Sequence, residues 1–310
     1  MRYDKPPTSI DEQIALLVDR GMYVPSAERA AHYLRHIGYY RLSAYWLPFE
    51  HPPVTQGQRS HRFLNQVSFD DVLDRYVFDR KLRLLCLEAL ERIEVSIRAS
   101  WVNALALRHG PHAYLDSNHF KCAYEHAGQV AKAASDMGRS SEVFIEHYRG
   151  KYCDPGLPPI WVMAETLSFG ALSKWIQSTR ETNIQKEVMH HLRLPTVEIV
   201  HGVFHNLSQL RNVCAHHSRL WNRRFPKKYP HIRKIPDLLH PETEGEEARY
   251  IRNHLVMLRY LMLVINPGTS WPQRLCDLLQ LQPSGTIAAM RLPDNWLELL
   301  QPTSLVGHRK

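Results

Sequence analysis

Four side chains within one heptapeptide could hold a phosphate group and move protons around it. Residues 211–217 have the sequence RNVCAHH, which supplies the guanidinium of Arg211, the carboxamide of Asn212 and the imidazoles of His216 and His217. Guanidinium groups bind phosphate oxygens through paired hydrogen bonds, and imidazole exchanges protons near neutral pH. The heptapeptide contains no carboxylate, so its residue types favour proton transfer at a bound phosphate over metal chemistry.

The heptapeptide lies near the end of a helix that we predict at about residues 197–220. At about 100° per residue, six apolar side chains gather on one face of this helix: Val200, Val203, Phe204, Leu207, Leu210 and Cys214. Arg211 falls roughly 20° from Val200 and therefore within the apolar face. A guanidinium that points toward a core is costly unless a charge or a hydrogen-bond partner meets it. Two interpretations stay open: an internal salt bridge, to Glu165 or to a carboxylate of the long helix expected at 69–107, or an arginine at the edge of a phosphate-binding cleft.

A polar stripe runs beside the apolar face. Its members recur at spacings of three and four residues: His201, His205, Ser208, Asn212, His216, Arg219 and Arg223. A solvated helix face usually mixes Glu and Lys, and this stripe has neither, although an exposed face rich in histidine is the alternative. His201 and His205 could bind a metal from one face, but no Asp, Glu or Cys accompanies them there. We therefore predict no metal site and no cofactor.

Arg211 and His216 point in different directions on one helix. They are five residues apart, which corresponds to a divergence of roughly 140°. A single copy cannot readily close both side chains on one phosphate, whereas two copies that face each other across a two-fold axis could. We therefore expect a homodimer. His217 is the competing histidine, and His216 is preferred because it continues the polar stripe.

The composition is that of a globular protein with an excess of basic residues. The chain has 310 residues, 44% of them apolar and 23% charged, with a formal net charge of +8 and a pI near 9.2. This charge favours an anionic partner such as nucleic acid.

The five cysteines are scattered and form no CxxC pair, which argues against a disulfide framework and a zinc ribbon and fits a reducing cytosol. The N-terminus lacks the apolar run of a signal peptide, and the most hydrophobic stretch, 255–265, is too short to cross a bilayer. We expect a cytoplasmic protein without a membrane partner.

The rest of the chain predicts helices throughout. A capping box at Ser9 begins the first helix and Gly21 would end it, Ser26 begins a second that ends by Gly38, and Ser68 caps a long helix that reaches about Leu107. Further helices are expected in two pieces over 121–151, broken near 137–138, and over 161–176, 184–192, 197–220, from 246 or 247 to 265, and near 271–282 and 294–300. No segment alternates with a period of two, and no Gly-rich phosphate loop follows a strand. The sequence therefore predicts an all-α fold.

Breaks in the helical pattern predict three parts. Residues 51–66 contain turn residues without a period, and they separate an N-terminal helical unit, 1–60, from a helical core over 65–266. Residues 111–158 form an insertion in this core, and 267–310 form a C-terminal helical extension.

Two smaller patterns also carry chemistry. Residues 39–46, YYRLSAYW, could stack on bases, but aromatic residues at helical spacing more often pack in a core, which is the interpretation we favour. Glu94 and Arg98 stand at i and i+4 of the long helix and predict an ordinary ion pair on its surface. A buried catalytic role for Glu91, Glu94 or Arg98 is the less favoured alternative.

The motif R-x4-H from Arg211 to His216, with a polar residue after the arginine, resembles that of HEPN ribonucleases. Other segments are similar to the Abi-like (AbiD/AbiF) abortive-infection family and span roughly residues 5–265. They are KP at 5–6, YYRLSAYW at 39–46, FDRKLR at 78–83, ERIE at 91–94, PIW at 159–161, FG at 169–170 and RNVCAHHSRLWN at 211–222. Residues 270–310 match nothing in that family.

This resemblance implies an all-helical HEPN-type domain with an N-terminal helical extension, and a role in bacterial defence against phage. It also implies metal-independent RNA cleavage at a site shared by two HEPN units, and an RNA partner that includes a structured non-coding RNA. His216 would act as general base or general acid, Arg211 would stabilise the phosphorane-like transition state, and Asn212 would orient His216 or the phosphate. Backbone affinity for RNA would come from a basic run at 219–234, chiefly from Arg219, Arg223, Arg224, Lys227 and Lys228.

Two other functions stay open. The first is a non-catalytic RNA-binding or adaptor protein of a defence or toxin–antitoxin system, in which the same helix only grips a folded RNA. The second is a structural interaction protein in which Arg211 forms a buried ion pair. Only one R-x4-H motif is clear in the chain, which indicates either dimerisation or loss of activity.

Overall fold

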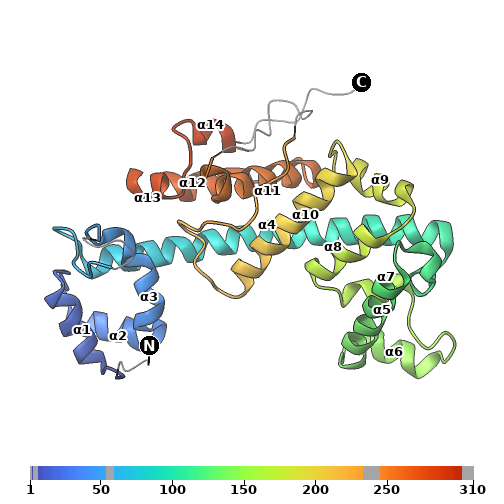
Figure 1. Cartoon of the computed structure of the whole chain (residues 1–310), viewed down its shortest axis with the longest axis horizontal. Helices are drawn as coiled ribbons and strands as arrows, with labels where there is room; N and C mark the ends of the chain where they lie inside the picture. Colours follow the sequence, from blue (N-terminus) through green and yellow to red (C-terminus); the bar gives the residue numbers. More distant parts are fainter. Residues whose placement is uncertain (1, 3–5, 54–58, 233–244, 302–310) are drawn as a thin grey trace. The chain divides into compact units, whose positions relative to one another are not determined.

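The computed structural model describes residues 2, 6–53, 59–232 and 245–301. These residues form fourteen α-helices and no β-strand, and their extended segments meet only in isolated bridges (Figure 1). The predicted all-α fold is therefore confirmed. Within the same residues, no helix is both long enough and apolar enough to span a membrane.

The helices follow one another along the chain as labelled in Figure 1. The α-helices are α1 (Ile10–Asp19), α2 (Ala27–Ile37), α3 (Tyr39–Trp46), α4 (Phe69–His109), α5 (Ala123–Gly138), α6 (Val143–Lys151), α7 (Ile160–Glu165), α8 (Phe169–Ser178), α9 (Thr182–His191), α10 (Val197–Ala215), α11 (Arg252–Ile265), α12 (Trp271–Gln280), α13 (Ser284–Ala289) and α14 (Trp296–Leu300). Short 3-10 turns are η1 (Leu47–Phe49), η2 (Ala113–Leu115), η3 (Ser117–His119) and η4 (Glu247–Arg249).

The chain divides into two compact units, residues 1–82 and 83–310. In the first unit, the predicted capping box is present at the start of α1, where Ser9 and Glu12 bond each other's backbone N–H groups. Ser26 caps α2 in the same way, by accepting from the N–H of Arg29. The two predicted helix starts are confirmed, because short polar side chains satisfy N–H groups that have no partner inside the helix.

Helix α3 supplies much of the core of this first unit. Tyr45 and Trp46 are buried, and the Tyr45 hydroxyl donates to the buried carboxylate of Asp79 at 2.6 Å. Tyr39 packs edge-on against Trp46, with ring centroids 4.9 Å apart. The aromatic run therefore packs as a core, as we favoured, with the exception of Tyr40, whose side chain is 92% exposed.

In the second unit, α10 packs against α8 and also contacts α9 and α11 (Figure 1). Helix α11 is buried along most of its length, and α12 and α14 pack on it. Helix α12 is fastened to α4 by Trp271, whose indole N–H donates to the carbonyl of Leu85 at 2.8 Å, and by the ion pair of Arg274 with Glu88. Helix α10, which carries the candidate site, is therefore packed on the core of this unit through one face.

Two of the predicted helices are interrupted, and one observed helix was not predicted. The helix expected over 161–176 is two helices, α7 and α8, because Ser168 caps a new start by accepting from the N–H of Ala171 at 3.3 Å. The helix expected from 246 or 247 begins instead as the 3-10 turn η4, and α11 starts at Arg252. Helix α13 occupies a stretch for which we predicted no element.

Candidate functional site

The apolar face of α10 is the part of the candidate site that the sequence predicts most closely. Thr196 caps the helix by accepting from the N–H of Ile199. All six residues predicted for that face are buried: Val200, Val203, Phe204, Leu207, Leu210 and Cys214. The orientation of α10 about its axis is therefore fixed by its packing, and with it the direction of Arg211.

Helix α10 ends at Ala215, five residues before the predicted end. The N–H of His217 donates to the carbonyl of Cys214 at 3.1 Å, and the N–H of Ser218 donates to that of Val213 at 3.0 Å. This pair of bonds is the Schellman arrangement, which usually places glycine at the left-handed position. Here His217 occupies it, with a φ of 55°, so the sequence gives no glycine signal for the helix end.

After His217 the chain leaves the axis of α10, and Leu220 and Trp221 enter the core. Leu220 and Trp221 are buried, and the indole N–H of Trp221 donates to the carbonyl of Thr286 at 3.0 Å. The buried Arg83 of α4 donates to the carbonyl of Ser218 at 3.4 Å. The predicted polar stripe is therefore wrong beyond His216, because Arg219 and Arg223 do not lie on a helix.

Arg211 is half-buried and lines a pocket of about 370 Å³ between α10 and α4. Among the described residues its guanidinium makes no hydrogen bond and no ion pair, although its charge partly opposes the rise in the pKa of Glu94 that burial causes. Three carboxylates line the same pocket, those of Glu88, Glu91 and Glu94. Glu88 is paired with Arg274 of α12, and Glu91 is exposed.

The internal salt bridge considered for Arg211 is made by Arg98 of α4 instead. The Arg98 guanidinium pairs with Glu94 at 3.0 Å and with Glu165 of α7 at 3.1 Å, and it also donates to the carbonyl of Leu167 at 3.3 Å. The side chains of Arg98 and Glu94 are only 11% and 13% exposed. The predicted ion pair of Glu94 with Arg98 is therefore confirmed, but its expected place on the surface is wrong, because the α7–α8 turn covers this part of α4.

The electrostatics of Glu94 reflect this burial. Burial raises the pKa of the Glu94 carboxyl above its ordinary value and outweighs the lowering effects of Arg98 and Arg211. Because Arg98 already bonds Glu94 and Glu165, Arg211 is left as a second cation beside a carboxylate that is satisfied.

Asn212 and His216 lie at the open end of α10. Both are exposed, and their side chains make no hydrogen bond within the described part of the chain. The backbone N–H of His216 donates to the carbonyl of Asn212 at 3.0 Å, which keeps His216 in helical register. By the 100° rule, Arg211 and His216 therefore still diverge by roughly 140°. The structure brings Asn212 and His216 to one surface and places Arg211 in the adjoining pocket.

The residues of the polar stripe that precede Asn212 are only partly accessible to solvent. His201, His205 and Ser208 are half-buried. The Nε2 atoms of His205 and Gln209 are 2.7 Å apart, so the amide donates to the neutral ring. Burial lowers the pKa of His205, and the charge of Lys227 lowers it further. The pKa of His201 is also lowered, by burial and by the charge of Lys121. Both imidazoles are thus held neutral, and no group of three or more metal-binding side chains occurs among the described residues.

Of the predicted basic run, residues 219–232 form a segment that lies beside α10, while 233 and 234 fall outside the described residues. Buried aromatic side chains recur every four positions at Trp221, Phe225 and Tyr229. They turn the intervening positions outward, where the basic residues lie. The segment is attached to α10 by Asn206, which donates to the carbonyl of Lys228 at 3.3 Å.

The five predicted RNA-binding residues are unequally available. Lys227 is exposed and Lys228 half-buried, and Arg224 is exposed but pairs with Glu246 at 2.5 Å. The guanidinium groups of Arg219 and Arg223 donate to carbonyls of their own loop, those of Asn222 at 3.5 Å and Arg219 at 3.2 Å. The segment therefore carries the predicted basic residues, but three of them, Arg219, Arg223 and Arg224, already bond other groups of the protein.

The described residues thus form an all-helical fold, with Arg211, Asn212 and His216 at the end of α10 as the candidate site. The family model described as Abi-like protein matches residues 32–222, more than half of the chain, including α10 and the heptapeptide. The chain therefore belongs to the Abi-like protein family. This membership associates it with abortive infection, the form of defence against phage after which the family is named. No curated protein and no solved structure was found to match the chain.

Proposed function

We propose that this Abi-like protein acts in phage defence as a HEPN-type endoribonuclease of the AbiD/AbiF kind, which cleaves RNA without a metal ion. The observation that carries the proposal is the state of Arg211. Its guanidinium is half-buried beside carboxylates yet bonds none of the described residues, because Arg98 holds Glu94 and Glu165. A positioned arginine without an internal partner is available for a phosphate.

In the proposed cleavage, His216 transfers the proton and Arg211 stabilises the phosphate. The exposed His216 accepts the proton of a ribose 2′-hydroxyl, or donates one to the leaving 5′-oxygen. The 2′-oxygen bonds to phosphorus as the bond to the 5′-oxygen breaks, and Arg211 stabilises the negative charge that gathers on the phosphoryl oxygens. Asn212, one helical turn before His216, orients the imidazole or the phosphate. The products end in a 2′,3′-cyclic phosphate and a 5′-hydroxyl.

The divergence of Arg211 and His216 supports a site built from two copies. In this arrangement Arg211 of one copy and His216 of the other face the same phosphate across a two-fold axis. The segment 219–232, which includes the exposed Lys227, supplies sequence-independent affinity for the RNA backbone.

The experiment is to isolate the protein with the RNA that co-purifies from its host and to incubate it with EDTA present. We expect cleavage to continue and the new ends to be 2′,3′-cyclic phosphates. If EDTA stops cleavage, or if the products carry 3′-hydroxyl ends, the metal-independent mechanism is wrong.

A non-catalytic RNA-binding or adaptor role is the second candidate. It is favoured by the carboxylates of Glu88, Glu91 and Glu94, which line the pocket of Arg211 and would repel a phosphate that enters it. This role predicts RNA binding that weakens as salt rises, with no cleavage at any pH.

A further inference from the structure

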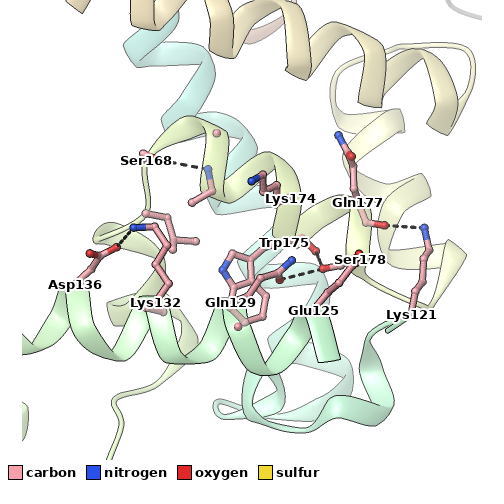
Figure 2. Close-up of a pocket in the computed structure, with 15 residues that line it drawn as sticks. Lys121, Glu125, Gln129, Lys132, Asp136, Ser168, Lys174, Trp175, Gln177 and Ser178 are labelled. Atoms are coloured by element: carbon pink, nitrogen blue, oxygen red, sulfur yellow. Dashed lines mark hydrogen bonds and ion pairs between the residues drawn. The ribbon is translucent and has the colours of Figure 1, made fainter. Parts of the chain in front are cut away.

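A second, larger cavity of about 850 Å³ lies between α5 and α8, and no residue of the candidate RNA site lines it (Figure 2). Its volume falls within the range of sites that bind small molecules. One wall is Trp175 of α8, and the rim carries the ammonium groups of Lys132 on α5 and Lys174 on α8.

Trp175 presents an unused hydrogen-bond donor to this cavity. The residue is only 2% exposed and packs edge-on against Phe120 and Tyr114, with ring centroids 5.1 and 6.2 Å away. The neighbouring Trp101 donates its indole N–H to Thr179 at 3.2 Å, but that of Trp175 has no acceptor among the described residues. This N–H is not among the fully buried unpaired atoms and therefore opens to the cavity. Because the indole N–H can only donate, a ligand that meets it there must supply an acceptor.

Five charged side chains line the cavity, the ammonium groups of Lys121, Lys132 and Lys174 and the carboxylates of Glu125 and Asp136. Cations are therefore in excess by one, which favours an anionic acceptor. Lys174 is exposed and makes no ion pair with a described residue. The carboxylate of Asp136 is balanced by two cations, Lys132 at 3.2 Å and Arg139 at 2.7 Å. The start of α8 also lines the cavity, where Ser168 caps the helix, and the first N–H groups of a helix attract anions.

We propose that this cavity binds the phosphate group of a small molecule of nucleotide size. The indole N–H of Trp175 and the ammonium groups of Lys132 and Lys174 donate to the phosphate oxygens, and the start of α8 adds its dipole. The cavity is one helix away from the candidate RNA site, since α8 packs on α10. The proposal does not depend on RNA cleavage.

The test is calorimetric titration of the full chain with AMP, ATP and inorganic phosphate. We expect at least one of these probes to bind one per chain. Trp175→Phe, which keeps an aromatic ring but removes the N–H together with part of the volume of the indole, and Lys174→Gln should each weaken binding about tenfold. Lys186→Gln, at an exposed position of α9 outside the cavity, should bind as the wild type does.

The probes also distinguish the source of the phosphate. Binding of a nucleotide but not of inorganic phosphate assigns a nucleotide site, and equal binding of both assigns a site for free phosphate. The proposal fails if no probe binds. It also fails if Trp175→Phe and Lys174→Gln both bind with wild-type affinity.

Discussion

His216 and His217 are adjacent residues with different backbones. His216 remains in helical register at the end of α10, where its side chain is exposed. His217 has a φ of 55°, in the left-handed region that glycine and asparagine adopt most readily. The helix end accounts for the backbone conformation of His217, whereas no contact with the described residues requires an imidazole at position 216.

Asparagine substitutions should separate the two histidines. Asn tolerates the left-handed conformation, so His217→Asn should fold normally and cleave RNA near the wild-type rate. His216→Asn removes the group proposed to transfer protons and should slow cleavage about 10²- to 10⁴-fold. The measurement is the rate of RNA cleavage with each variant, and the reverse pattern would assign the chemistry to His217.

The two arginines on either side of Glu94 should differ in their effect on stability. Arg98→Ala leaves the largely buried carboxylate of Glu94 without its partner and should lower the free energy of unfolding by about 3 kcal/mol. Arg211→Ala removes no hydrogen bond or ion pair to a described residue and should cost about 1 kcal/mol or less. Urea unfolding of the two variants measures both values. A larger loss for Arg211→Ala would show that Arg211 is a structural residue.

His254 of α11 makes the stability of the protein depend on pH. The ring is buried between Phe225 and Tyr229, and burial lowers the pKa of His254 from 6.5 to about 3. Above pH 6.5 the residue is neutral in both states. Below it, the unfolded chain gains a proton that the folded chain excludes until about pH 3. The free energy of unfolding should therefore fall by about 1.4 kcal/mol per pH unit across this window.

The control for this prediction is His254→Phe, which keeps a ring between the same neighbours and removes the titrating group. Unfolding of the wild type and the variant is measured from pH 7 to pH 4. We expect a shallower slope in the variant, and equal slopes would exclude His254 as the cause.

At the scale of the secondary structure, some features of α10 were predictable and others were not. Its start and its apolar face follow from Thr196 and from the spacing of six apolar residues, which are local signals. Its end does not, because a histidine occupies the left-handed position and because distant contacts, of Arg83 with Ser218 and of Trp221 with Thr286, turn the chain. The split between α7 and α8 depends on a single serine cap within a continuous apolar pattern.

The packing of segment 219–232 on α10 can be tested at Gly202. A Cβ atom there would meet the ring of Pro230 at 3.0 Å, whereas one at Gly128 of α5 would meet nothing. Gly128→Ala should stabilise the protein by up to about 1 kcal/mol through helix propensity. Gly202→Ala should lose this gain to overpacking, which costs about 1–3 kcal/mol. Thermal unfolding compares the two, and an equal gain in both would show that the segment does not pack on α10.

At the scale of the whole molecule, the sequence predicts the helical class and the family, but not the two cavities. The pocket of Arg211 needs residues of α4 that lie more than a hundred positions earlier in the chain, and the cavity at Trp175 needs α5. The ion pair of Arg98 with Glu165 likewise joins two helices that no local pattern connects. Such arrangements arise from tertiary packing, so the sequence could name Arg211 as a candidate but not the group that would pair with Glu165.

The central claim is that Arg211 and His216 of two copies form one RNA-cleaving site, and mixing inactive variants tests it most directly. Arg211→Ala and His216→Ala are assayed for RNA cleavage in EDTA, separately and after they are mixed and allowed to exchange subunits. Each variant alone should lose activity, and the mixture should recover about a quarter of the wild-type rate, since about half of the dimers then hold one intact site. Cleavage at the wild-type rate by either variant alone would contradict the account.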